Sequence, residues 1–308
     1  MDPLSQVLSL LKPRSYITAG FDAGGDWALL LDDLAGRIKC YAVVQGSCWL
    51  SVDGAAPAVR LQAGDCFVLP SGRSATIGSA PDIAPRRAGD VLNPNSNGAV
   101  VTYNGGGDVF LVGSRFEVNG RHAEILLRTL PPLMRVETSG DRARLRWSIE
   151  LMMEELRENR PGASLVAQQL AHMMLVQALR LYLETHDGAT AGWFTALADT
   201  RVRTALSAIH ADPAHPWTVQ ELAACAGMSR STFAQHFRER AGETPIAYLT
   251  RWRMMLAGER LAQGQETLAR IGQSLGYDSE HAFNTAFKRV MGEAPRRYAR
   301  AARHEPPP

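Results

Sequence analysis

"GYDSEHAFNTAFKRVMGEAP", residues 276–295, has a shorter echo earlier in the chain in "GMSRSTFAQHFRERAGETP", residues 227–245. Matched residues lie 50 positions apart within and after the second helix of each copy, and 49 apart upstream of it. The matched pairs are Leu222 and Ile271, Ala223 and Gly272, Gly227 and Gly276, Phe233 and Phe283, Phe237 and Phe287, Gly242 and Gly292, Pro245 and Pro295, and Tyr248 and Tyr298. The one-residue difference falls in a turn, where an insertion costs least. Self-similarity at a fixed spacing predicts a duplicated structural unit.

Each copy has the residue pattern of two short helices joined by a sharp turn. In the first copy, Thr218 and Glu221 have the spacing of a capping box. Gly227 permits the turn and Ser229 can cap the next helix. The second copy repeats this pattern, with Thr267 and Ser279 as caps, Gly276 in the turn, and Phe283 and Phe287 four residues apart on the inner face. The sequence therefore predicts two helix-turn-helix units.

The outward face of the second helix in each unit is polar and basic. It carries Ser231, Gln235, Arg238 and Glu239, flanked by Ala234, in the first copy, and His281, Thr285, Lys288 and Arg289, flanked by Glu280 and Asn284, in the second. Short polar side chains near a helix N-terminus can reach base edges in the major groove, and basic side chains farther along can reach phosphates. The alternative is a helical repeat whose polar faces are only solvated.

The segment between the copies, "TPIAYLTRWRMMLAGERLAQG" at residues 244–264, begins with a cap and a proline and ends at Gly264. A helix of about nineteen residues spans about 28 Å. Successive major grooves on one side of DNA are about 34 Å apart. We therefore expect one chain to place its two outward faces in adjacent major grooves.

Charge and composition agree with a polyanion partner at one end of the chain. Residues 200–308 hold 15 Lys and Arg against 10 Asp and Glu, whereas the rest holds 18 against 21, which together give the net charge of +2. The chain has no run of eighteen apolar residues, and its start lacks the pattern of a secretory signal, so we expect no membrane span and a cytoplasmic location. The four cysteines form no CxxC pair and are expected to be reduced and mostly buried.

Residues 199–301 resemble the DNA-binding domain of AraC/XylS transcriptional regulators. The matching segments are "TVQELAACAGMSRSTFAQHFRERAGETPIAYLTRWRM" and "LARIGQSLGYDSEHAFNTAFKRVMGEAPRRYAR", whose G-Y-x-S, F-x-x-A-F-K-R and G-x-x-P-x-x-Y patterns are highly specific. The resemblance implies contact with double-stranded DNA through Ser231, Ala234, Gln235, Arg238, Glu280, His281, Asn284, Thr285 and Lys288. Glu280 departs from the uncharged polar residue often found there; an acid can accept from a cytosine amino group, or it can face solvent.

Residues 1–135 read as short strands separated by turns, which favours a barrel or sandwich. The stretch "GDCFVLPSGRSATIGS", residues 64–79, resembles the second cupin motif, but Ala75 and Ser79 stand where that motif has His and Asn. Lys39 occupies the glutamate position of the first motif, and His122 is the sole histidine before residue 150. The ligands of a cupin metal are therefore missing, and we predict no metal, no cofactor and no catalytic residues. A cupin isomerase or oxygenase fused to a DNA-binding module is the enzymatic alternative.

AraC-type regulators with cupin-like N-terminal domains commonly use the barrel to sense a small molecule. On that resemblance, Trp27, Tyr41, Trp49, Arg73 and Tyr103 are candidate effector-binding residues. Aromatic residues on strands also form plain core, and an arginine at a turn also serves as a solvated surface group. A constitutive regulator whose barrel only dimerises is therefore the alternative to an effector-controlled one.

The whole pattern predicts a multidomain α and β fold. We expect an N-terminal cupin-like β-barrel at 1–135, a helical linker or dimerisation segment at 136–198, an all-α domain with two helix-turn-helix units at 199–301, and a disordered tail at 302–308. The family resemblance implies a homodimer formed through the linker helices, with RNA polymerase as a further candidate partner. The alternative for these helices is that they pack on the barrel.

Overall fold

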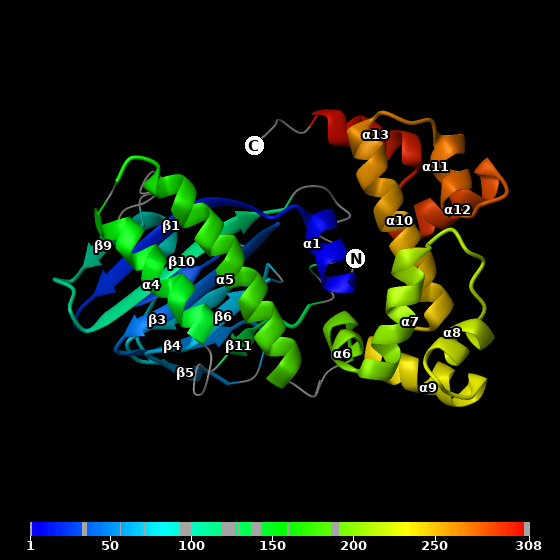
Figure 1. Cartoon of the computed structure of the whole chain (residues 1–308). Helices are drawn as coiled ribbons and strands as arrows, with labels where there is room; N and C mark the ends of the chain where they lie inside the picture. Colours follow the sequence, from blue (N-terminus) through cyan, green and yellow to red (C-terminus); the bar gives the residue numbers. More distant parts are fainter. Residues whose placement is uncertain are drawn as a thin grey trace. The chain divides into compact units, whose positions relative to one another are not determined.

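The computed structural model describes residues 2–32, 36–55, 57–70, 72–92, 100–118, 123, 127, 130–136, 143–158, 160–185 and 191–304. The chain forms two compact units (Figure 1). The sheet unit comprises residues 13–118 and 130–185, and the helical unit comprises residues 1–12, 119–129 and 186–308. Within the described ranges, no helix is long and apolar enough to cross a membrane.

The sheet unit contains two sheets whose inner faces share one hydrophobic core. The six-stranded sheet has the order β11-β6-β3-β10-β1-β9 and the five-stranded sheet has the order β5-β4-β7-β2-β8. Their bounds are β1 Arg14–Ala23, β2 Ala28–Leu31, β3 Arg37–Gln45, β4 Ser47–Val52, β5 Val59–Gln62, β6 Cys66–Leu69, β7 Ala75–Gly78, β8 Arg86–Arg87, β9 Val100–Tyr103, β10 Val109–Glu117 and β11 Met134–Val136, with the short helix α2 at Ala88–Val91. Phe67 and Leu111 from the first sheet join Leu50 and Ile77 from the second in the core. This confirms the predicted cupin-like N-terminal architecture.

Two long helices cover the outer face of the six-stranded sheet (Figure 1). They are α4 (Ala143–Glu158) and α5 (Ala163–Thr185), which pack on each other and on strands of this sheet. His172 of α5 connects the layers: its Nε2 lies 2.6 Å from the carbonyl oxygen of Pro13, and its ring meets Phe116 edge to face at 5.1 Å. These helices therefore pack on the barrel, while Trp147 and Leu165 stay 53% and 62% exposed.

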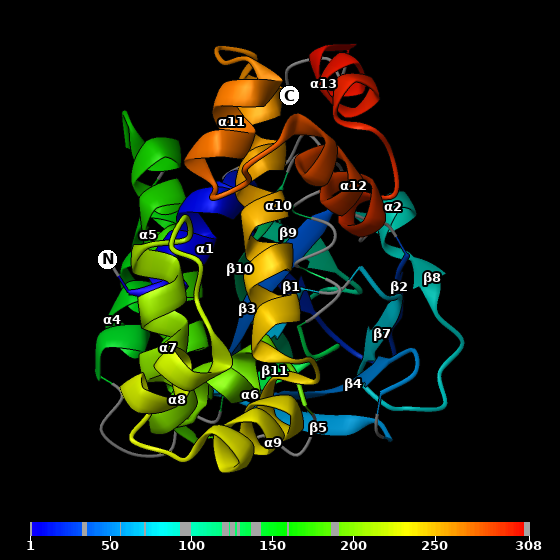
Figure 2. The same ribbon diagram turned by 90° about the vertical axis from the view of Figure 1, so that its right-hand side faces the viewer.

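The helical unit is built around one central helix, α10 (Pro245–Gln263). In Figure 2, α8 and α9 lie toward one end of α10, and α11, α12 and α13 lie toward the other. The bounds are α6 Trp193–Ala198, α7 Thr200–Ala211, α8 Val219–Cys225, α9 Arg230–Ala241, α11 Leu268–Ser274, α12 Glu280–Met291 and α13 Pro295–His304. The observed length of α10 is the nineteen residues that the sequence predicts. The all-α C-terminal fold with two helix-turn-helix pairs is confirmed.

The first helix of the chain belongs to the helical unit, although it precedes the barrel in sequence. This helix, α1 (Pro3–Leu11), contacts α7, and Gln6 Oε1 lies 2.9 Å from Nδ1 of His210. Lys12 pairs with Glu259 of α10. Residues 1–12 thus cluster with the C-terminal helices, and residues 130–185 cluster with the barrel. The domain limits that the sequence predicts, 1–135, 136–198 and 199–301, are not tested by this division into two units and stay predictions.

Candidate nucleic-acid interface

The two helix pairs form because their ends are capped as the sequence predicts. Thr218 Oγ1 accepts from the Glu221 amide at 3.2 Å and Glu221 Oε2 accepts from the Thr218 amide at 2.8 Å, which completes the capping box. Ser229 caps α9 and Ser279 caps α12 through the amides three residues on. Gly227 and Gly276 have φ of 64° and 79° in the two turns, a conformation that glycine adopts freely.

Helices α9 and α12 are each held by an equivalent set of two phenylalanines and one tyrosine. Phe233 and Phe237 of α9 are fully buried with ring centroids 5.6 Å apart, and Phe237 meets Tyr248 edge to face at 6.0 Å. In the second unit, Phe283 and Phe287 lie 5.9 Å apart, and Phe287 meets Tyr298 at 5.4 Å. Because the two aromatic cores are equivalent, α9 and α12 turn the same side inward. The side of each helix that lies away from its phenylalanines is therefore the exposed one, and it carries residues at matching positions of the repeat.

The residues of α9 that the sequence predicts to contact DNA lie on the exposed side of the helix or at its margin. Ser231, Gln235 and Arg238 are exposed, and Ala234 is half-buried beside them. Gln235 Nε2 donates to Glu239 Oε1 at 2.9 Å. The Arg238 carbonyl accepts from the Gly242 amide at 2.9 Å, but its side chain has no hydrogen bond or ion pair among the described residues. Its guanidinium is therefore free to meet an anion.

The predicted residues of α12 form the equivalent surface, with one exception. Glu280, His281, Thr285 and Lys288 are exposed, whereas Asn284 is half-buried and its Oδ1 is a buried acceptor with no hydrogen-bond partner in the described part of the chain. Thr285 Oγ1 donates to the His281 carbonyl at 3.0 Å, so its lone pairs remain available as acceptors. Asn284 stands where the first unit has Ala234, at the margin of the exposed face.

In the sheet unit, the candidate effector residues lie in different places. Tyr41 stacks on Phe67 at 5.8 Å, and Tyr103 stacks on Phe21 at 6.3 Å. Trp49 is half-buried on β4. The Arg73 guanidinium donates to the carbonyls of Asp53 and Gly54 at 3.2 and 3.1 Å, so it ties down a turn.

Trp27 is the one predicted effector residue that lines a described cavity of about 530 Å³ in this unit. It is 2% exposed, and its indole Nε1–H is buried with no partner among the described residues. The remaining wall consists of Gly25, Gly46, Ser47, Arg60, Gln62, Ala63, Ser79, Asp108 and Val109. Sequence reasoning missed Arg60 and Asp108, since they come from separate strands and turns and no motif joins them.

Lys39, Ala75 and Ser79, which stand at positions of the cupin motifs, are buried or half-buried in the sheet unit. Lys39 and Ala75 are each 1% exposed, and Ser79 Oγ accepts from the Trp27 amide at 3.0 Å. In the described ranges, no group of three or more His, Cys, Asp or Glu side chains is placed to hold a metal ion. Cys40, Cys48 and Cys66 are buried and free, whereas Cys225 is free and exposed.

Comparisons with known proteins agree with both units. A cupin family model matches residues 2–184, and a helix-turn-helix domain model matches residues 222–301. A protein of Streptomyces lividans named as an AraC-like transcription regulator is 44% identical over 300 residues, which cover 97% of this chain and 98% of that protein. A regulator of the same name from Streptomyces antibioticus is 42% identical over 97% of this chain and 98% of its own. The transcriptional regulator AlkR of Acinetobacter baylyi is 30% identical, with 97% and 99% covered. The chain belongs to the AraC family of DNA-binding transcriptional regulators, with a cupin region followed by a helix-turn-helix domain.

Proposed function

We propose that this regulator binds its operator by placing α9 and α12 in two successive major grooves. The observation that carries the proposal is the repeated Phe-Phe-Tyr core, which turns equivalent polar faces of the two helices outward. Base edges are read by Ser231, Ala234 and Gln235 on α9, and by Glu280, His281, Asn284 and Thr285 on α12. Arg238 and Lys288 lie farther along their helices and contact phosphates.

We further propose that a small polar molecule controls the protein by binding in the cavity lined by Trp27 and Arg60. The Arg60 guanidinium at the wall of this cavity is a donor, so the effector carries a carboxylate or carbonyl acceptor. The Asp108 carboxylate at the same wall accepts from the Gly25 amide at 2.8 Å and leaves capacity for a ligand hydroxyl. Effector binding shifts the equilibrium between states that differ in DNA affinity.

The exposed apolar residues of α4 and α5 favour a second role for the sheet unit, which is dimerisation. Trp147, Leu165 and Val166 are 53%, 62% and 44% exposed, and large exposed apolar side chains are common in protein interfaces. We propose that the protein acts as a homodimer and recruits or blocks RNA polymerase, with no catalytic step of its own. A constitutive dimer would use this surface without the cavity.

Selection of duplexes from a random pool by the full-length protein tests the DNA proposal. We expect two conserved half-sites about one helical turn apart for each chain, and affinity that falls steeply with salt. Binding without a preferred sequence would contradict the assignment of α9 and α12. A thermal-shift screen of carboxylic acids and polar metabolites then separates effector control from a constitutive regulator.

A further inference from the structure

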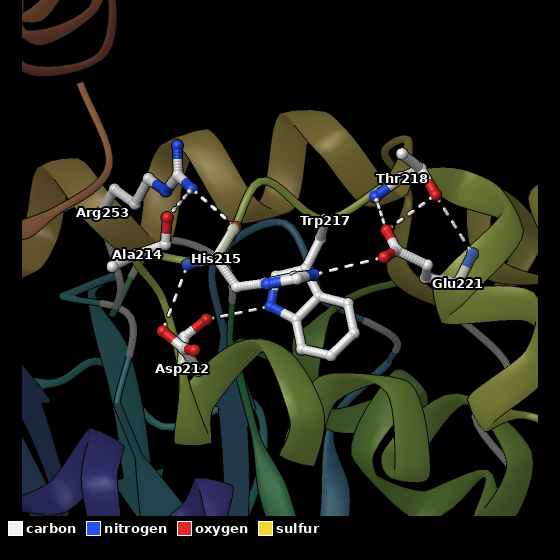
Figure 3. A network of polar contacts seen from close by, with 7 residues as sticks. All are labelled: Asp212, Ala214, His215, Trp217, Thr218, Glu221 and Arg253. Carbon is white, nitrogen blue, oxygen red and sulfur yellow. Dashed lines mark hydrogen bonds and ion pairs between the residues drawn. The ribbon is translucent and has the colours of Figure 1, made fainter. Parts of the chain in front are cut away.

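Arg253 takes part in a polar network around the loop that leads into the first helix-turn-helix unit (Figure 3). It belongs to α10 and is 9% exposed. Its Nε donates to the Pro213 carbonyl at 2.6 Å, and its second terminal nitrogen donates to the carbonyls of Ala214 and His215 at 3.2 and 2.9 Å. These three carbonyls belong to the loop that enters the first unit. In the described part of the chain, no carboxylate pairs with this buried cation.

The other side of Arg253 faces the turn of the second unit. Its guanidinium carbon lies 5.6 Å from the centroid of the Tyr277 ring, which is a cation–π distance. Gly276 approaches the same loop so closely that a Cβ there would lie 2.2 Å from the Ala214 carbonyl oxygen and 3.0 Å from Arg253. Arg253 therefore fills the junction between the 213–215 loop and the 276–277 turn.

The loop around residues 212–217 also contacts α8 of the first helix-turn-helix unit. Asp212 Oδ1 accepts from the His215 amide at 3.1 Å, and the Asp212 carbonyl accepts from the Trp217 indole at 2.9 Å. His215 Nε2 lies 3.3 Å from Glu221 Oε1, and Glu221 completes the cap of α8 (Figure 3). A contiguous set of contacts thus runs from the turn before α12 to the helix on which α9 packs.

We propose that Arg253 is a positioning residue for two-groove recognition, because it holds the relative placement of α9 and α12 that matches the spacing of two half-sites. The inference rests on the proposed function, in which both helices read DNA. Arg253 touches no base in this scheme; it acts through the loop and turn that it joins. Its loss would let the two units move relative to each other about α10.

The DNA test uses full-length wild type and Arg253→Met with the selected operator and with the same operator carrying one extra base pair between its half-sites. One base pair moves the second half-site by about 3.4 Å and rotates it around the duplex. We expect wild type to prefer the correct spacing by about tenfold or more, and Arg253→Met to prefer it by about twofold. Arg253→Lys keeps the charge and can reach one carbonyl, so we expect an intermediate preference.

Arg251→Met is the matched control on the same helix. Arg251 donates through Nε to Glu243 at 3.0 Å within the first unit, so its loss costs an ion pair without touching the second unit. The control should keep the full spacing preference. If Arg253→Met loses affinity equally for both operators, or keeps the wild-type preference, the positioning role is wrong. If wild type itself shows no bipartite site, the proposed function fails and this inference fails with it.

A measurement without DNA tests the inference separately. Cys225 is an exposed native thiol on α8, and Gln273 is exposed on α11, so Gln273→Cys gives one spin-label position in each unit. Cys40, Cys48 and Cys66 are buried. We expect a narrow within-chain distance distribution for the labelled protein diluted with unlabelled protein, and a broad or shifted one after Arg253→Met. An unchanged distribution would overturn the proposal even if DNA recognition is bipartite.

Discussion

The hydroxyl oxygen of Tyr248 lies 2.6 Å from Nε2 of His210 in the core of the helical unit. Burial raises the pKa of Tyr248, so its hydroxyl stays protonated and donates to the imidazole. The other ring nitrogen, Nδ1, then carries the proton and donates to Gln6 Oε1 at 2.9 Å. The ring also stacks on Trp252 at 3.9 Å. A neutral histidine thus joins α1, α7 and α10.

This arrangement predicts that acid destabilises the helical unit. Burial, with a smaller contribution from the Arg251 cation, lowers the pKa of His210 to about 3. An unfolded histidine has a pKa of about 6.5, so below that pH the unfolded chain binds a proton that the folded chain excludes. The free energy of unfolding should therefore fall by up to about 1.4 kcal/mol per pH unit between about pH 6.5 and pH 3, and show no His210 contribution above pH 6.5.

Urea unfolding at pH 7.5 and 5.0 measures this effect in wild type and His210→Gln. The variant should be less stable at pH 7.5, because it loses the hydrogen bonds of the imidazole, but its free energy of unfolding should change less between the two pH values. His281→Gln, which removes an exposed histidine of α12, is the control for the replacement of one histidine by glutamine. Equal pH dependence in wild type and His210→Gln would contradict the buried neutral imidazole.

The two turn glycines predict unequal costs for the same substitution. Both have positive φ, but a Cβ on Gly227 would meet nothing within 4 Å, whereas one on Gly276 would lie 2.2 Å from the Ala214 carbonyl oxygen. Gly227→Ala should cost about 1–2 kcal/mol of stability from backbone strain. Gly276→Ala should cost about 1–3 kcal/mol more because the loop must move. If thermal or urea unfolding gives equal losses of stability for both variants, the loop at Ala214 moves away from residue 276 at no cost, and the prediction is wrong.

Base reading predicts losses confined to one half-site. Gln235→Ala and Thr285→Ala should each cost about 1–3 kcal/mol of binding free energy and relax base preference, the first in the half-site of α9 and the second in that of α12. Repeating the duplex selection with each variant shows which positions lose information. Equal weakening on all sequences would remove the residue from the base-reading set.

Lys288 predicts a different signature because it contacts phosphate in the proposed complex. Lys288→Ala should weaken binding to all duplexes about equally and lower the slope of log K against log salt by about one. Affinities measured on the operator and on a scrambled duplex over a salt series test this. A loss confined to the operator would make Lys288 a base-reading residue instead.

The helix-turn-helix units were predictable because their determinants are local. Caps such as Thr218 and Ser229, turn glycines and paired phenylalanines act within a few residues, and the duplication shows each of them twice. Contacts between segments that are distant in the chain have no comparable pattern in the sequence. The Gln6–His210 hydrogen bond and the Arg253 junction depend on how helices pack, and one arginine among many in the C-terminal part has no local mark of that role.

The cavity of the sheet unit could not be predicted from the sequence for the same reason. The strands could be predicted from the spacing of turn residues. The cavity wall combines residues from different strands and loops, so its position depends on strand register. Aromatic type alone selected Trp27, which lines the cavity, together with Tyr41 and Tyr103, which pack against Phe67 and Phe21.

Two arginines of the sheet unit give the sharpest test of effector control. Arg60 lines the cavity and donates to Ser47 Oγ at 3.1 Å, whereas Arg73 is held by backbone carbonyls of a turn and lines no part of that cavity. For a carboxylic acid that raises the melting temperature, Arg60→Ala should lower the affinity at least about tenfold, as expected for a lost charge-assisted hydrogen bond. Arg73→Ala should lower the stability of the unliganded protein and leave the ligand-induced shift intact. If both variants keep the shift, the effector binds elsewhere; if Arg73→Ala alone loses it, the turn at residues 53–54 is part of the binding site and the cavity at Trp27 is not.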